Sequence, residues 1–469
     1  MSRRRGRMAL RPLGDVKRLQ PRRSAQNDVR AVAAWVVERT LASLAPVDAF
    51  LDGALARLDE RDRALLRELV LGTLRWLRRL DHVLVQASER ELAAIDSELL
   101  GLLRVAAYQL LFLTRVPAHA VVSEAVAQAH GRSHRGGVSF VNAVLRRIAR
   151  NPVLAAWPVA EADPVVRLAI ETSHPDLLVR RWLPRFGERA TRALLAANNR
   201  PKPLHLLAFR DRGGRELAAE ALIEAGLEVE ASALAPFGLT VREGLPWGTA
   251  AFREGALYAQ DEASQVAALL PPPAPGERIL DVAAAPGGKS FSLLAYEPTV
   301  RVVAADRSPE RLGLLAANLR RLRRPLPLLC ADGRRAPWRS RFDRVVVDLP
   351  CSGTGTLRKN PELKWRLSEA EIARLAASGL DLLAGAADAV AAGGRLVAMT
   401  CSLEPEENER LVEAFLAARP EFAREPLAPL LPRSMPGPRT RLGSGGCSRE
   451  AGTTASPSRS CAAADRPRR

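Results

Sequence analysis

The chain has 469 residues, of which 47% are hydrophobic, and a formal net charge of +18. This length allows two or three domains with ample core, and no apolar run is long enough to cross a bilayer. Five cysteines, an odd number without paired metal spacing, and the lack of a continuous apolar stretch in residues 1–30 argue against a secreted disulfide framework. We expect a cytoplasmic monomer in a reducing environment.

The excess positive charge is concentrated at the two ends of the chain. Residues 1–30 hold ten Lys or Arg against two acids, and residues 433–469 hold eight against two. We interpret residues 1–27 and 433–469 as basic, disordered tails, and an RNA-binding arm is the alternative interpretation of such segments. The six histidines show no metal-ligand spacing, so no metal site is predicted.

Residues 28–150 are expected to form an all-α bundle. Leu66, Leu69 and Val70, for example, fall on one face at the 3.6-residue period. Within this block, residues 135–147 combine a glycine-containing loop with a helix that ends in arginines. These arginines could contact RNA, or they could be the solvated face of an ordinary amphipathic helix.

Residues 151–273 are expected to form a linker and a small α/β extension. After a helical run at 177–195, short strand candidates at 204–209 and 239–242 flank a helix at 216–225.

Residues 274–432 alternate strand and helix, as a doubly wound parallel sheet requires. Ser368 and Glu371 form a capping box that starts a long helix toward Val390, and another helix covers 406–418. No alternating apolar run follows, so the two strands that usually close such a sheet are expected to be missing, which exposes an edge. The expected strands are 278–282, 301–306, 326–331, 344–349 and 395–400.

Three short motifs follow the ends of these strands. Residues 283–289 form a turn of small residues, which lets backbone amides approach a cofactor. Cys351 follows Asp348-Leu349-Pro350, and Cys401 lies between Thr400 and Ser402. A thiol beside small residues at the end of a buried strand can present a nucleophile where α/β sheets bind ligands, although an isolated cysteine is by default an inert core residue. Together the motifs indicate covalent chemistry next to a nucleotide-like cofactor.

In order and spacing, these segments resemble motifs I, IV and VI of the RNA cytosine-5 methyltransferases, which use S-adenosylmethionine. The chain from residue 28 to residue 431 resembles the ribosomal small-subunit methyltransferase B branch, whose N-terminal domain is similar to the antitermination factor NusB. The resemblance implies a multidomain fold. A NusB-like, RNA-binding helical domain (28–150) precedes an α/β Rossmann-like S-adenosylmethionine-dependent methyltransferase domain (274–432), with a small extension like an RNA-recognition motif (151–273) between them.

The resemblance also implies a role for each candidate residue. Cys401 would add to carbon 6 of a cytosine, Cys351 would assist release of the covalent adduct, and Asp348 would bind the polar edge of the base. Lys289 would orient Asp348 or the base. Asp306 would bind the cofactor's ribose and Asp332 its adenine side, although each aspartate taken singly is more often a turn former. The expected cofactor-binding residues are Ala283, Ala284, Ala285, Pro286, Gly287, Gly288, Lys289, Asp306, Asp332 and Asp348.

Arginine outnumbers lysine 65 to 5, yet Lys289, Lys359 and Lys364 all lie near the candidate site. A compact ammonium in a tight site is not replaceable by a guanidinium. The segment from Arg358 to Trp365 resembles the family's substrate-facing segment. A basic pair beside an aromatic can hold phosphate and stack a base, which favours contact with RNA. A solvated loop is the competing interpretation.

The implied function is methylation of carbon 5 of a cytosine in 16S ribosomal RNA, with ribosomal RNA as partner and no membrane association. The alternative is a non-catalytic RNA-binding or antitermination factor that uses the helical domain. Cys401, Cys351 and Asp348 together favour the enzyme, because a binding module has no use for them.

Overall fold

The structure is a computed structural model that describes residues 28–43, 45–151, 154, 159, 161–335, 338–426 and 446–449. The chain divides into two compact units. The first contains the residues up to Lys202 together with Ser352–Ile372 and Cys401–Leu403, and the second contains Pro203–Cys351, Ala373–Thr400 and Glu404 onward. The predicted tail 1–27, and 433–469 apart from 446–449, lie outside the described residues.

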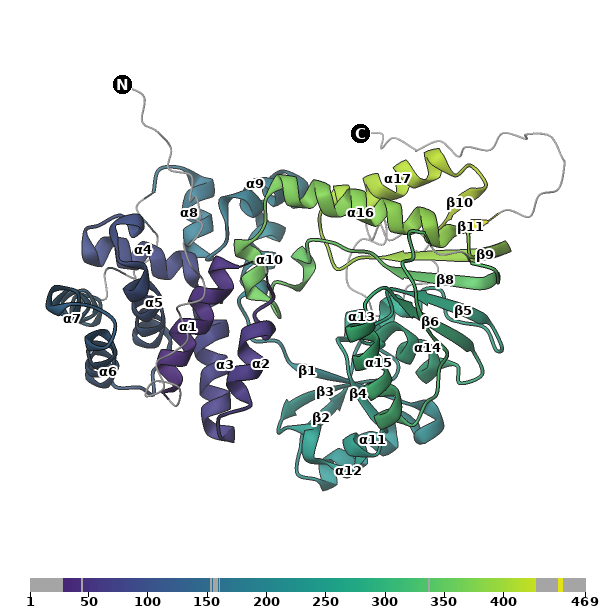
Figure 1. The fold of residues 1–469 in the computed structure, drawn as a ribbon, viewed down its shortest axis with the longest axis horizontal. Helices are drawn as coiled ribbons and strands as arrows, with labels where there is room; N and C mark the ends of the chain where they lie inside the picture. The colour runs from purple at the N-terminus through teal and green to yellow at the C-terminus, as the bar shows by residue number, and fades with distance from the viewer. Residues whose placement is uncertain are drawn as a thin grey trace, which may run out of the picture. The chain divides into compact units, whose positions relative to one another are not determined.

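The first unit begins with the all-α bundle that the sequence predicts (Figure 1). Side-chain caps start several helices: the Asp28 carboxylate accepts from the amides of Arg30 and Ala31, and Asp59 accepts from the amide of Asp62. One continuous core fills the bundle. Its elements are α1 (Val29–Ala42), α2 (Asp48–Leu55), α3 (Glu60–Arg75), α4 (Leu77–Ser88), η3 (Leu92–Ala94), α5 (Ser97–Phe112), α6 (Ala118–His130) and α7 (Arg135–Arg150).

Three further helices complete the first unit around the fully buried Trp182. They are α8 (Pro164–Glu171), α9 (Asp176–Phe186) and α10 (Glu188–Asn198), followed far along the chain by the 3-10 turns η7 (Thr354–Thr356) and η8 (Pro361–Trp365). Leu357 and Leu403 pack into the Trp182 core, and Trp365 packs into the bundle core.

The second unit begins with a four-stranded antiparallel sheet in the order β2-β3-β1-β4. The predicted strands at 204–209 and 239–242 and the helix between them are present. The other two strands have no alternating apolar pattern in the sequence, because β2 is polar and largely exposed and β4 has only three residues. The elements are β1 (Leu204–Ala208), η5 (Arg210–Arg212), α11 (Gly214–Glu224), β2 (Glu228–Ala231), β3 (Gly238–Glu243), η6 (Pro246–Gly248), α12 (Ala250–Arg253) and β4 (Leu257–Ala259).

A seven-stranded sheet in the order β10-β11-β9-β8-β5-β6-β7 forms the rest of the second unit (Figure 1). The strands from β5 to β9 pair in parallel, which confirms the expected Rossmann-like class. The strands are β5 (Arg278–Val282), β6 (Arg301–Asp306), β7 (Leu328–Cys330), β8 (Phe342–Asp348), β9 (Val390–Met399), β10 (Phe422–Glu425) and β11 (Gly446–Arg449). The helices are α13 (Glu262–Ala268), α14 (Gly288–Tyr296), α15 (Pro309–Leu322), α16 (Glu369–Ala387) and α17 (Glu409–Ala418), with η9 (Pro405–Glu407) before α17.

Both faces of this sheet are covered by helices. Alternate residues of β8 point to opposite faces, so Val345 packs in one core with Leu383 of α16 and Phe415 of α17. Val346 packs in another core with Leu293 of α14. Figure 1 shows α16 and α17 on one face and α14 on the other. The carboxyl ends of the parallel strands therefore meet at one edge, where ligands bind in this class of fold.

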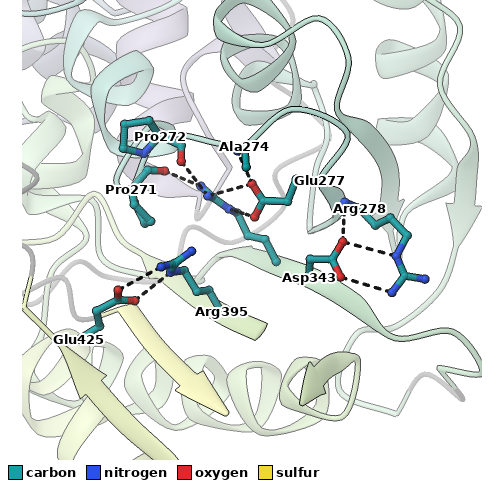
Figure 2. Close-up of polar contacts among 9 residues, drawn as sticks. Pro271, Pro272, Ala274, Glu277, Arg278, Asp343, Arg395 and Glu425 are labelled. Atoms are coloured by element: carbon teal, nitrogen blue, oxygen red, sulfur yellow. Dashed lines mark hydrogen bonds and ion pairs between the residues drawn. The ribbon is translucent and has the colours of Figure 1, made fainter. Parts of the chain in front are cut away.

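The expectation that the closing strands are missing is wrong. β11 pairs antiparallel with β9 on one side and β10 on the other, and Arg395 of β9 forms a bidentate ion pair with Glu425 of β10 (Figure 2). Pairing uses backbone groups, so a strand of sequence Gly-Cys-Ser-Arg forms without an alternating apolar pattern.

Candidate functional site

In the turn after β5, residues 283–289, two residues have a left-handed backbone conformation. Ala283 has a φ of 61° and Gly287 a φ of 113°, a region that residues with side chains rarely adopt. A Cβ at Gly287 would lie 2.5 Å from the Phe291 ring, so only glycine fits there. The Ala284 amide donates to the Ala305 carbonyl at 2.9 Å, which ties the turn to β6. The turn then enters α14, which begins at Gly288.

Asp306 lies at the end of β6, as predicted, and is almost fully buried. Its Oδ2 accepts from the Ala285 amide at 3.2 Å, and its Oδ1 accepts from the Ser308 amide at 3.0 Å. Arg311 pairs with Asp306 Oδ2 at 3.6 Å and also donates to the Ala285 carbonyl. Asp306 therefore shapes the 283–289 turn.

Asp332 follows β7 and is tied to its neighbour Arg334. The Arg334 amide donates to Asp332 Oδ1 at 3.1 Å, and the Arg334 guanidinium binds both carboxylate oxygens. The guanidinium hydrogen bond lowers the pKa of Asp332 to about 2. The residue thus forms a turn, the ordinary role of an aspartate after a strand, and keeps its charge at neutral pH.

Lys289 and Asp348 contact each other directly. The Lys289 ammonium, at the start of α14, donates to Oδ2 of Asp348 at the end of β8. The Asp348 side chain remains about one-third exposed, at 35%. The expected contact between this lysine and this carboxylate is therefore present, and the carboxylate is still accessible to a ligand.

Asp281 is a buried carboxylate that the sequence-based site does not include. It is fully buried in β5, and its Oδ2 accepts from the Ser290 hydroxyl at 2.6 Å and the Ser290 amide at 3.1 Å. Burial raises its pKa to about 6, against the lowering effects of Ser290 and then Lys289. A charged residue inside the apolar run of β5 is the signal that could have found it.

Both candidate cysteines follow strands that are paired with each other. Asp348 of β8 is the register partner of Met399 of β9, and the Leu349 amide continues the pairing to the Met399 carbonyl at 2.8 Å. Cys351 is half-buried and Cys401 is exposed. The two thiols thus come from chain segments that leave neighbouring strands at their carboxyl ends.

The thiol of Cys401 lies close to the small-residue turn that follows Cys351. A Cβ built on Gly353 would lie 3.8 Å from the Cys401 sulfur, and the Gly355 amide donates to the Cys401 carbonyl at 2.9 Å. Gly353 has a φ of 70°. This turn therefore needs glycine both for its backbone conformation and for its close approach to the Cys401 segment.

Lys364 and Trp365, at the end of the segment that starts at Arg358, differ from both sequence-based interpretations. Trp365 is buried, with its indole nitrogen donating to the Leu74 carbonyl at 2.7 Å, and Lys364 is fully buried. Arg358 donates to the carbonyls of Arg200 and Pro201 at 3.2 and 2.5 Å. Trp365 is thus neither a base-stacking platform nor part of a solvated loop, because it fills the bundle core. Lys359 is exposed.

Within residues 28–426, apart from the gaps given above, and 446–449, no group of three or more His, Cys, Asp or Glu could hold a metal ion. No helix in this part of the chain is long and apolar enough to span a membrane.

Comparison with known proteins identifies the family. Residues 267–432 match the family described as 16S rRNA methyltransferase RsmB/F, residues 27–150 match the NusB family, and residues 174–247 match the ferredoxin-like domain of RsmF/B-like methyltransferases. Ribosomal RNA small subunit methyltransferase B of Pseudomonas putida is 37% identical over 406 residues, 83% of this chain and 89% of that protein. The chain belongs to the RsmB family of ribosomal RNA methyltransferases.

Other relatives agree with this assignment. Ribosomal RNA small subunit methyltransferase B of Sodalis glossinidius is 35% identical over 401 residues, covering 84% of this chain and 90% of its own. The crystal structure of PH0851 aligns at a TM-score of 0.72 and 26% identity, covering 90% of this chain and 98% of that one. The protein is therefore an S-adenosylmethionine-dependent methyltransferase that acts on ribosomal RNA.

Proposed function

We propose that this RsmB-family protein methylates carbon 5 of a cytosine in 16S ribosomal RNA through a covalent adduct with Cys401. The observation that carries the proposal is the arrangement at the carboxyl ends of β8 and β9. Asp348 pairs with Lys289 at the end of β8, and the chain leaves the paired strands β8 and β9 toward Cys351 and Cys401.

Carbon 5 of cytosine is by itself too weak a nucleophile to attack a methyl donor. The reaction therefore requires a second nucleophile that adds to the ring first. The Cys401 thiolate adds at carbon 6, forming a sulfur–carbon bond and moving the electron pair of the 5,6 double bond onto carbon 5. The cofactor supplies an electrophilic methyl group on a sulfonium. Asp348 binds the polar edge of the base, and Lys289 orients this carboxylate. Once carbon 5 carries the methyl group, transfer of its proton to water, assisted by Cys351, re-forms the 5,6 double bond and breaks the sulfur–carbon bond, which releases the Cys401 thiolate.

The cofactor-binding residues are proposed from the same geometry. The 283–289 turn would surround the methionine portion, Asp306 would bind the ribose and Asp332 would face the adenine. The NusB-like helical domain would bind the RNA. A non-catalytic RNA-binding role is the alternative for the whole chain, but it leaves the two thiols and the Lys289–Asp348 pair without a purpose.

The two cysteines can be tested separately with 16S ribosomal RNA transcripts, S-adenosylmethionine and the full chain. Cys401→Ser should abolish methyl transfer and the covalent adduct, because no thiolate remains to attack carbon 6. Cys351→Ser should accumulate a long-lived protein–RNA adduct on a denaturing gel. The control is Cys330→Ser, which removes an exposed thiol at the end of β7 and should change neither readout. An adduct with Cys401→Ser but none with Cys351→Ser would reverse the two roles, and full methylation by Cys401→Ser would refute the proposal.

A further inference from the structure

Two short segments, one of which contains the candidate nucleophile, pack with the helices of the first unit. Ser352–Ile372 follows Cys351, and Cys401–Leu403 contains the nucleophile itself. Both belong by sequence to the methyltransferase block, yet their interior contacts are with α3, α8, α9 and α10. Residues outside the Rossmann-like sheet therefore contribute to the position of Cys401, which follows β9 through Thr400.

Lys364 anchors the first of these segments. Its side chain is fully buried, and its ammonium donates to the Arg75 carbonyl at 3.1 Å, the Ser173 carbonyl at 3.1 Å and Asn199 Oδ1 at 2.8 Å. The three N–H groups of an ammonium thus meet three oxygen acceptors. A planar guanidinium cannot make this compact, three-way contact. This explains why position 364 is a lysine in a chain whose basic residues are mostly arginine. The neighbouring Trp365 adds the indole hydrogen bond to the Leu74 carbonyl.

Thr354 connects this anchored segment to the nucleophile. It is fully buried, and its Oγ1 accepts from the Leu403 amide at 2.8 Å. The hydroxyls of Thr354 and Ser402 hydrogen-bond at 3.3 Å, and Ser402 also hydrogen-bonds the Ser352 hydroxyl at 3.2 Å. With the Gly355 amide on the Cys401 carbonyl, these contacts hold the backbone on the C-terminal side of the thiol.

The helices also hold Leu403 directly. Arg185 of α9 donates to the Leu403 carbonyl, and the Leu403 side chain packs in the core around Trp182 together with Leu357. The backbone amide and carbonyl of Leu403 are thus both bound, the amide by the fully buried Thr354 and the carbonyl by Arg185. Supporting contacts of this kind hold a reactive group within the small tolerance that its chemistry needs.

We propose that Thr354 and Lys364 are positioning residues for the reaction: Lys364 anchors the 352–372 segment in the helical unit, and Thr354 fixes the Cys401–Leu403 backbone so that the thiol attacks carbon 6. The inference rests on the proposed role of Cys401. It assigns to the helical unit a part in catalysis that is separate from binding RNA.

The decisive variant is Thr354→Val, which keeps the side chain's shape and removes its hydroxyl. We expect it to slow adduct formation about 10- to 100-fold with 16S ribosomal RNA transcribed with 5-fluorocytidine, which traps the adduct. With unmodified RNA the loss should appear in the kcat of methyl transfer, with the KM for RNA and the Kd for S-adenosylmethionine unchanged. Thr354→Ser, which restores a hydroxyl, should recover most of the rate. If Thr354 had only a structural role, Thr354→Val would lower Tm but would not lower kcat selectively while KM stays unchanged.

Thr40→Val is the matched control. Thr40 is also buried in the first unit, but its Oγ1 makes no hydrogen bond within the described part of the chain. The same chemical change should therefore leave the rate of adduct formation unchanged. Lys364→Met, which removes the three anchoring hydrogen bonds, should lower kcat in the same direction as Thr354→Val; if it fails to fold, Thr354→Val alone decides.

The possible failures can be distinguished. If the wild-type protein forms no adduct, or if Cys401→Ser still forms one, the proposed role of Cys401 is wrong. If the wild-type adduct depends on Cys401 but Thr354→Val forms it at the wild-type rate, the positioning role is wrong and the nucleophile assignment stands.

Discussion

Asp281 shows how a single buried carboxylate links the candidate site to the stability of the protein. Its side chain is fully buried, and its pKa is raised to about 6 from an ordinary value of 3.8, mainly by burial. Between these two values the folded state binds a proton that the unfolded state has released. The free energy of unfolding should therefore fall as the pH rises from about 4 to about 6.

Replacing Asp281 with Asn should remove this pH dependence, because the side chain no longer ionises. We expect the wild-type protein to lose on the order of 1–3 kcal/mol of unfolding free energy between pH 4 and pH 7 from this group, and Asp281→Asn to lose correspondingly less. Urea unfolding at several pH values measures the difference. Asp381→Asn, at an exposed position on α16, is the control and should keep the wild-type dependence. Equal pH profiles for the wild type and Asp281→Asn would contradict the assignment.

The contacts of residues near the site were predictable where they depend on nearby motifs, and not where they depend on residues far away in the sequence. The contact of Lys289 with Asp348 agrees with the role that the family resemblance implied for this lysine, and the carboxyl ends of β5 and β8 bring the two residues to one edge. The burial of Lys364 and Trp365 was not, because a basic and aromatic stretch after a loop is typical of a nucleic-acid contact. Only the distant acceptors Arg75, Ser173 and Asn199 make burial of that lysine possible, and nothing near it in the sequence indicates them.

At the scale of elements, the strands with continuous apolar runs were predicted well and the irregular ones were not. β5 and β6 have the predicted bounds, since β-branched residues buried on both faces are easily recognised. β9 begins at Val390, five residues before the predicted start, and it continues through Gly393, which has a φ of 73°. The register between β8 and β9 shifts in this stretch, between Phe342 and Arg344, so glycines that suggest a loop instead belong to an irregular strand.

A buried ion pair joins the start of β5 to β8 at the end of the sheet opposite Asp306 and Asp348. Arg344, 1% exposed, donates to Glu277 at 2.9 and 3.2 Å and to the carbonyls of Pro271 and Pro272 at 2.5 and 3.1 Å. Figure 2 shows Glu277 turned toward these prolines, and beside it the exposed pair of Arg278 and Asp343. The two pairs allow the same change to be compared in a buried and an exposed setting.

Glu277→Ala should destabilise the protein by about 3 kcal/mol, because it leaves the guanidinium of Arg344 buried without a counter-charge. Asp343→Ala, which breaks the exposed pair, should cost less than about 1 kcal/mol. Urea unfolding measures both, and calorimetry should show an unchanged Kd for S-adenosylmethionine in the folded Glu277→Ala protein. Equal costs for the two substitutions would mean that burial of the pair does not determine its contribution.

At the scale of the whole molecule, the compact units do not follow the order of the chain. Segments 352–372 and 401–403 leave the methyltransferase block and pack with helices encoded at least 150 residues earlier. Sequence periodicity reports the environment of an element within its own stretch and carries no information on such long-range exchange. The family and the fold class were therefore predictable from motifs, whereas the support of the nucleophile by the helical unit required the structure.

The C-terminal strand provides the last prediction, which reverses the interpretation of residues 433–469 as an appendage. β11 lies between β10 and β9, so ending the chain after Pro432 removes the partner of both strands. Phe422 of β10, which packs against Phe415 of α17 at a centroid distance of 5.4 Å, then loses its attachment to the sheet. We expect a lower Tm and weaker amide protection in β9 for this truncation, whereas ending the chain after Arg449 should preserve both.

A point substitution tests the same strand without shortening the chain. Cys447→Pro places a residue without a backbone donor in the middle of β11, where Cys447 is the register partner of Leu396 and Arg424, and it should lower Tm as the longer truncation does. Cys461→Pro, beyond the end of β11, should leave Tm unchanged. If both truncations and both proline variants melt at the wild-type temperature, β11 does not contribute to the sheet. Residues 433–469 would then be dispensable for folding, as the sequence composition suggests.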